Sequence, residues 1–85
     1  MAYRVYFQPR AEKSLLKAPR DMQGRLRNAI LDLAETPRPR GAKKLKGERD
    51  TWRIRIGDWR VVYVPNDDAR AVIVTVIGHR REVYE

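Results

Sequence analysis

Cysteine is absent from this 85-residue chain, which excludes disulfide frameworks, thiolate nucleophiles and cysteine-ligated zinc sites together. No stretch approaches the run of about 20 apolar residues that a membrane-spanning helix needs. Residues 1–7 also lack the cationic segment followed by an apolar core that marks a secretory signal. We therefore expect a soluble protein of the reducing cytoplasm, with no membrane partner.

Acidic residues are few relative to basic ones, with 11 Asp and Glu against 19 Lys and Arg, which gives a formal net charge of +8. Such a field attracts polyanions and repels copies of the same chain. Nucleic acid is the leading class of partner. A solvated basic surface, or an acidic protein partner, would account for the same charge. Because so short a chain cannot divide its apolar residues between two cores, we expect a single domain, residues 1–85.

Hydrophobic periodicity predicts an order of strand, two helices and three strands. β-branched and aromatic residues favour a first strand, and apolar side chains at helical spacing then form two stripes, the second stopped by Thr36-Pro37. Three apolar runs follow, the first two joined by a tight turn at Gly57-Asp58. The expected elements are strand 3–7, helices 11–17 and 22–33, and strands 52–56, 59–64 and 71–77.

This order predicts an α+β domain, with two N-terminal helices packed on one face of a small, mainly antiparallel four-stranded twisted sheet. The last strand is apolar on both sides, as is typical of a strand inside a sheet. Residues 38–50 carry two glycines and a dense run of Arg and Lys, and we expect them to form a basic loop.

Strict alternation in residues 52–56 places Arg53 and Arg55 on the side of the strand away from Trp52. Their guanidiniums would then stand about 6–7 Å apart, a spacing that suits neighbouring phosphates. The same pattern is also how an ordinary solvent-facing strand looks. Arg60 across the turn, and Arg80 after the last strand, favour a phosphate site, because converging cations are costly without an anion.

Three segments together resemble the RelE/ParE toxin superfamily of type II toxin–antitoxin systems. They are Lys44-Leu45-Lys46-Gly47, the string Trp52-Arg53-Ile54-Arg55-Ile56-Gly57-Asp58-Trp59-Arg60-Val61-Val62-Tyr63, and Ile77-Gly78-His79-Arg80-Arg81-Glu82-Val83-Tyr84. The resemblance covers nearly the whole chain and favours a RelE-like member. It implies a toxin that cleaves messenger RNA in the ribosomal A site, without a metal or other cofactor, and that is neutralised by a cognate antitoxin.

The resemblance also implies roles for individual residues. Arg53 and Arg55 occupy the positions of two strand lysines in RelE-like enzymes, and Arg60 the position of a phosphate-binding arginine. Arg80 matches an arginine proposed as the general acid, with Arg81 as an adjacent alternative. Tyr84 matches a C-terminal tyrosine that stacks on or orients the nucleotide.

Arginine at positions 53 and 55 is the main departure from the family pattern. A guanidinium almost never releases its proton, so Arg55 suits a phosphate clamp and not a general base. The candidates for the base are Glu82, His79 and Glu48. His79 is the chain's one histidine, and imidazole titrates near neutral pH, although a surface histidine after a strand needs no catalytic role.

Four cations in the basic loop, Lys43, Lys44, Lys46 and Arg49, are expected to contact RNA phosphates without reading sequence. We also expect an acidic antitoxin whose amphipathic segment covers apolar surface. Two other functions fit the same residues. One is a ParE-like toxin that inhibits DNA gyrase without ribonuclease activity, and the other is a basic module that binds nucleic acid without cutting it.

Overall fold

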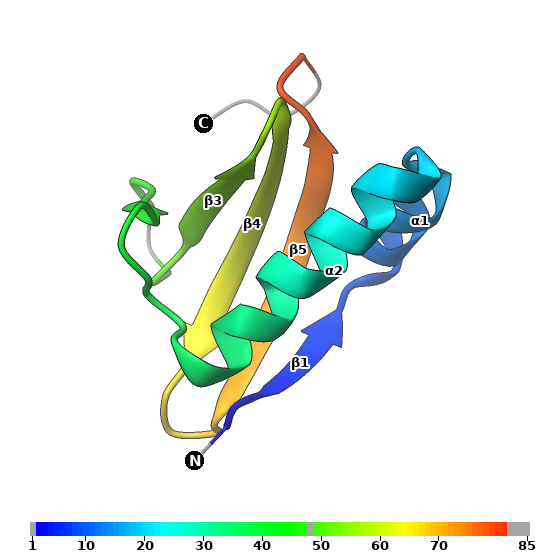
Figure 1. Ribbon diagram of the computed structural model, residues 1–85. Coiled ribbons are helices and arrows are strands. Elements are labelled where there is room, and N and C mark those ends of the chain that lie inside the picture. Colours follow the sequence, from blue (N-terminus) through cyan, green and yellow to red (C-terminus); the bar gives the residue numbers. More distant parts are fainter. Residues whose placement is uncertain (1, 48, 82–85) are drawn as a thin grey trace.

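The computed structural model describes residues 2–47 and 49–81, which form two helices and one five-stranded sheet (Figure 1). In chain order the elements are β1 (Arg4–Phe7), α1 (Pro9–Lys17), α2 (Arg20–Glu35), β2 (Lys43–Lys44), β3 (Trp52–Ile56), β4 (Trp59–Asn66) and β5 (Ala71–His79). The strand order is β1-β5-β4-β3-β2. β1 runs parallel to β5, and the other neighbours are antiparallel. The predicted α+β class is confirmed.

The sheet has one more strand than the sequence predicted. The additional strand is β2, two lysines within the expected loop, which pair with Arg53 and Trp52 of β3. Pro65 and Asn66, expected in a turn, extend β4 and pair with β5. The reversal between β4 and β5 therefore occupies residues 67–70.

Prolines set the ends of both helices. α1 begins at Pro9, where the fixed φ of proline suits a first turn. It ends at Lys17 because Ala18 precedes Pro19 and is extended, with ψ of 153°. α2 likewise stops before Thr36-Pro37. Neither helix in the described part of the chain is long and apolar enough to cross a membrane.

Both helices pack on the same side of the sheet, and α2 crosses β4 and β5 on that side (Figure 1). The buried core combines one stripe from each helix with alternate residues of three strands. Its members are Ala11, Leu15, Ala18, Leu26, Ile30, Leu33, Ile54, Val61, Tyr63, Val72, Val74 and Ile77. The opposite side of the sheet carries neither of the two helices, and several side chains there, among them Tyr6 and Arg55, are exposed.

Tyr63 connects the end of α2 to the middle of the sheet. Its ring is fully buried, and its hydroxyl donates a hydrogen bond to the Pro37 carbonyl at 2.7 Å. Burial raises the pKa of Tyr63 to about 12. The hydroxyl therefore remains a donor at physiological pH and fixes the start of the basic loop.

Candidate functional site

The side of the sheet that the helices leave uncovered, called here the open face, carries most of the predicted site. Cross-strand partners share a side, so the register defines this face from β1 to β3. Arg55 pairs with Arg60, Arg53 with Val62, and Tyr6 with Ile73. Their neighbours along each strand, among them Ile54 and Val61, point into the core. The open face is therefore basic over β3 and the start of β4.

Arg55 and Arg60, the arginine pair, stand directly opposite each other across β3 and β4. Opposite residues in an antiparallel pair lie about 5 Å apart at Cα. Arg55 is exposed, whereas Arg60 is half-buried. A phosphate held between the two guanidiniums could accept hydrogen bonds from both forks.

Arg53 lies on the same face, two residues along β3, as the alternation predicts. It is only 5% exposed, and its register partners are Lys43 on β2 and Val62 on β4. β2 thus places a further cation beside it. The two arginines on this side of β3 therefore differ in exposure, because Arg55 is exposed and Arg53 is buried.

Arg80 lies just beyond β5, at the end of the sheet where the arginine pair stands. Gly78, two residues earlier, is the β5 partner of Arg60. The backbone N–H of Arg80 donates to the Asp58 carbonyl at 2.7 Å, and its Nε is 3.9 Å from the Asp58 carboxylate. Asp58 therefore tethers Arg80 to the β3–β4 hairpin. Arg81 follows and is exposed.

His79 is not brought to the open face. It pairs in register with Trp59, and the two rings meet edge to face with centroids 6.0 Å apart. Trp59 in turn pairs with Ile56, and both pack against the core on the helix side of the sheet. The geometry places His79 on the opposite side from the arginine pair. The other candidates for proton transfer or stacking, Glu48, Glu82 and Tyr84, lie outside the described residues.

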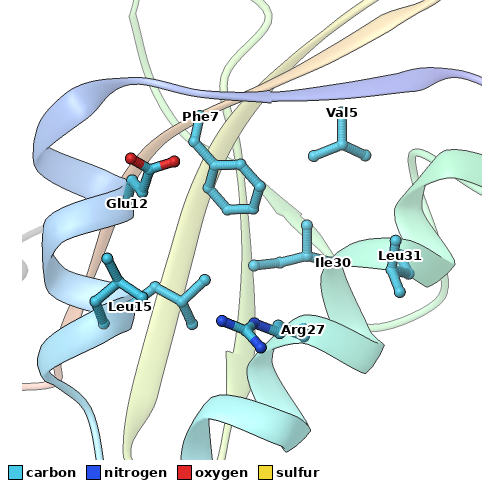
Figure 2. A pocket seen from close by; sticks show the side chains of 8 residues that line it. Val5, Phe7, Glu12, Leu15, Arg27, Ile30 and Leu31 are labelled. Atoms are coloured by element: carbon cyan, nitrogen blue, oxygen red, sulfur yellow. The ribbon is translucent and has the colours of Figure 1, made fainter.

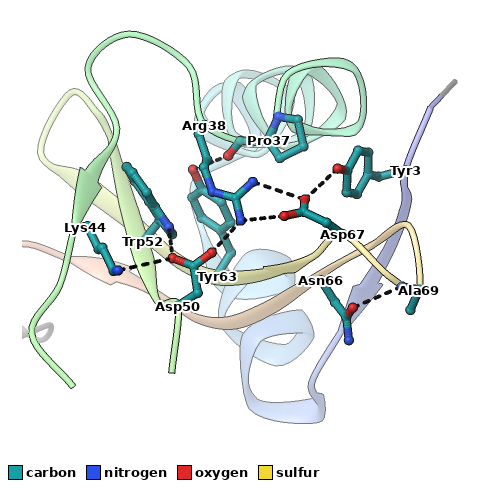
Figure 3. A network of polar contacts seen from close by, with 10 residues as sticks. All are labelled: Tyr3, Pro37, Arg38, Lys44, Asp50, Trp52, Tyr63, Asn66, Asp67 and Ala69. Carbon is teal, nitrogen blue, oxygen red and sulfur yellow. Dashed lines mark hydrogen bonds and ion pairs between the residues drawn. The ribbon is translucent and has the colours of Figure 1, made fainter. Parts of the chain in front are cut away.

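A polar network centred on Arg38 anchors the basic loop to the far end of the sheet (Figure 3). Arg38 donates to both carboxylate oxygens of Asp67, at 3.1 and 3.2 Å, and also to Asp50. Tyr3 donates to Asp67 at 2.6 Å, and the Trp52 indole donates to Asp50 at 2.6 Å. The Arg38 guanidinium also lies 5.8 Å from the centre of the Trp52 ring.

The network shifts the titration of both of its carboxylates. The hydrogen bond from Arg38 is the main reason that the pKa of Asp50 lies below its ordinary value, and the same holds for Asp67. The hydrogen bond to Asp67 is the main cause that raises the pKa of Tyr3. Both aspartates are therefore ionised at neutral pH, and the network joins the ends of the loop to β1 and to the β4–β5 turn.

The loop's other cations project from this anchored segment. Lys43, Lys44, Lys46 and Arg49 are all exposed. Lys44 reaches Asp50 at 3.8 Å. Arg49 lines a groove of about 550 Å³ on the open face, whose floor includes Val64, Ile73 and Thr75. The structure thus brings Arg49 to the same face as the arginine pair.

An apolar cavity of about 390 Å³ opens on the helix side, between β1, α1 and α2 (Figure 2). Figure 2 shows Phe7, Leu15 and Ile30 pointing into it, with Glu12 and Arg27 at its border. Leu16 and Leu31 also line it and are 59% and 62% exposed. Exposed leucines around a cavity are typical of a protein-binding surface.

No three His, Asp or Glu side chains gather as potential metal ligands within residues 2–47 and 49–81. Sequence reasoning missed Arg38, Asp50 and Asp67, because their partnership depends on contacts between residues far apart in the chain. Its one available signal was an aspartate two residues before a tryptophan, which permits the Asp50–Trp52 hydrogen bond.

Comparisons with known proteins agree with this arrangement. The family model for ParE toxins of type II toxin–antitoxin systems, parDE, matches residues 5–84. The mRNA interferase toxin RelE of Escherichia coli is 33% identical over 88 residues, covering 99% of this chain and 92% of the relative. The toxin–antitoxin complex RelBE2 of Mycobacterium tuberculosis matches with a TM-score of 0.83 and 28% identity, over 94% of this chain and 93% of that one. The intact E. coli RelBE complex gives 0.81 and 29%, over 92% and 96%.

These matches identify the class of protein that the fold and the basic face define: the chain belongs to the RelE/ParE superfamily of type II toxins. The family model bears the name of ParE, whereas the curated relative and both solved structures bear the name of RelE. Within the superfamily the chain is a RelE-like member, as the resemblance implied.

Proposed function

We propose that this chain is a cytoplasmic endoribonuclease toxin that cleaves messenger RNA in the ribosomal A site. The observation that carries the proposal is the arginine pair, two arginines in direct register on the open face of the sheet. The relative from E. coli is named an mRNA interferase, which supports messenger RNA as the substrate.

Cleavage of RNA by its own 2′-hydroxyl develops negative charge on the phosphate oxygens as the O–P bond forms. Arg55 and Arg60 can donate hydrogen bonds to those oxygens, and such bonds strengthen as the charge grows. Arg53 lies beside Arg55 on the same face and is buried. Fixed cations supply here the charge stabilisation that a metal ion supplies in other nucleases. The proposed reaction accordingly needs no metal.

Proton transfer requires two further groups, an acceptor for the 2′-hydroxyl proton and a donor to the departing 5′-oxygen. We place Arg80, which Asp58 tethers at the end of the sheet where the arginine pair stands, beside the departing 5′-oxygen, where its guanidinium can donate a hydrogen bond that stabilises the developing negative charge. We propose Glu48 or Glu82 as the acceptor in preference to His79, because the His79 ring packs against Trp59 on the other side of the sheet. Tyr84 retains its proposed role in orienting the nucleotide.

We further propose an acidic antitoxin as the regulatory partner. The solved structures that this chain resembles include toxin–antitoxin complexes. A net charge of +8 would attract an acidic chain, and the apolar cavity with its exposed Leu16 and Leu31 offers surface for an amphipathic segment. Growth arrest on expression of the toxin alone, relieved by co-expression of the acidic partner, is the expected result.

One preparation of purified toxin can distinguish ribonuclease from gyrase inhibitor. We expect it to cut messenger RNA on programmed ribosomes, at the A-site codon, and to leave supercoiling by purified DNA gyrase unchanged. Inhibited supercoiling with intact message would replace the proposal with the ParE-like function. Intact message with unchanged supercoiling, but salt-sensitive RNA binding, would leave only the binding module.

A further inference from the structure

The open face continues from the arginine pair across β5 to β1, where a large aromatic side chain is exposed. Tyr6 is 51% exposed, although its strand neighbours Val5 and Phe7 pack against the core. Arg4, two residues earlier, points to the same side and is exposed. An aromatic ring beside a cation on an uncovered sheet is the combination on which single-stranded RNA commonly stacks.

The groove on the open face lies next to this ring. Tyr6 pairs with Ile73, and Ile73 pairs with Val64, and both of these residues form the groove's floor. Thr75 also lines the groove, and its carbonyl accepts a hydrogen bond at 2.9 Å from Nε of Arg10 at the start of α1. Tyr6 and Arg10 therefore lie on the β1 side of the groove, next to Ile73 and Thr75, which line it.

Cations also line the groove toward the basic loop, where Arg38 and Arg49 contribute to its wall. Asp50 and Asp67 line that wall too, and Arg38 donates to both carboxylates, so the charge of Arg38 is balanced within the wall and Arg49 is the cation that it adds to the groove. Asp68 remains an acidic group at the turn end of the groove. Arg49 therefore lies on the loop side of the groove, while Arg4 and Arg10 lie toward β1, and separated arginines of this kind can contact successive phosphates of one nucleic-acid strand.

We propose that the β1 side of the open face is a second contact for single-stranded RNA, in which a base stacks on Tyr6 and flanking phosphates meet Arg4 and Arg10. The inference rests on the proposed function, because it takes RNA as the occupant of this face. Tyr6 and Arg60 are separated by four residues along β4, roughly 13 Å, and by two strands, roughly 10 Å. A short segment of one message can therefore contact both places.

The test measures binding alone, with a fluorescently labelled RNA octamer whose 2′-hydroxyls are methylated so that it cannot be cut. Tyr6→Val keeps a strand-forming residue but removes the ring, and is expected to weaken binding about fivefold or more. Tyr6→Phe keeps the ring and should bind like the wild type. Arg4→Ala should reduce the slope of log affinity against log salt by about 0.7, whereas Tyr6→Val should leave that slope unchanged.

Arg20→Ala is the matched control, since it removes one exposed arginine from the start of α2 on the helix side. It should change affinity less than Arg4→Ala does. Equal affinity of Tyr6→Val and wild type, or no measurable wild-type binding at low salt, would overturn the inference and assign the ring to a protein contact. If either result came with message cleavage on ribosomes by the wild-type toxin, the proposed function would stand without this second contact. If the wild-type toxin cleaved no message but Tyr6→Val still bound RNA more weakly, the second contact would stand and the proposed function would fall.

Discussion

Replacing Arg60 by alanine removes one arm of the arginine pair and should slow cleavage far more than it changes the overall charge. Arg60 is half-buried and stands opposite Arg55, so a phosphate bound there is shielded from water on the sheet side. Hydrogen bonds between charged groups in such places contribute about 1.5–3 kcal/mol. The single-turnover rate on programmed ribosomes should therefore fall roughly 10- to 150-fold.

Two comparison variants remove the same unit of charge elsewhere. Lys43→Ala deletes an exposed ammonium on β2, where ion pairs contribute about 0.2–1 kcal/mol, so its rate should fall fivefold at most. The cleavage rate of Arg20→Ala, which removes an arginine on the helix side, should fall less still. Arg60→Lys keeps the charge but loses the two-pronged donor, and we expect an intermediate rate.

The assay is the rate of message cleavage at saturating toxin, with thermal unfolding of each variant as the folding control. Equal losses for Arg60→Ala, Lys43→Ala and Arg20→Ala would refute the reasoning. They would show that bulk positive charge, and not an organised pair, carries the activity.

Three further predictions concern the framework of the site. Arg38→Met should lower the free energy of unfolding at neutral pH, because Arg38 depresses the pKa of Asp50 and Asp67. In denaturant titrations from pH 6 to about pH 2.5, the difference in unfolding free energy between wild type and variant should be full above about pH 4 and should shrink as the pH falls further. A difference that grows toward acid pH would contradict this. Tyr63→Phe removes the hydroxyl that bonds Pro37 and should cost about 0.5–1.5 kcal/mol, a fall of several degrees in Tm; an unchanged Tm would mean that the bond contributes nothing. Gly57→Ala should destabilise the β3–β4 hairpin by about 1 kcal/mol, because φ at Gly57 is +60° while the added Cβ meets Arg25 only at an ordinary 3.7 Å; equal stability would refute a strained turn.

Local pattern was sufficient for much of the fold. The alternation in residues 52–56 predicted which side of β3 carries its arginines, and Gly57-Asp58 predicted the hairpin that brings Arg60 opposite Arg55. These features depend on neighbours in sequence and on a period of two residues. They positioned the arginine pair correctly.

Features that depend on contacts between residues far apart in the chain could not be predicted from the sequence. β2 consists of two lysines with no apolar pattern, so nothing distinguished it from a loop, yet it pairs with Arg53, which is buried. The side on which His79 lies follows from its register with Trp59, which no local signal specifies. The Arg38 network likewise joins residues from four separate segments.

The most direct test of the central claim maps the ends of messages in cells after brief induction of the toxin. Wild-type toxin should produce new message ends at the A-site codon of translating ribosomes, and the double variant Arg55→Ala, Arg60→Ala should produce none at equal expression. Growth arrest by the wild type with intact messages, or the same ends produced by the double variant, would contradict the account.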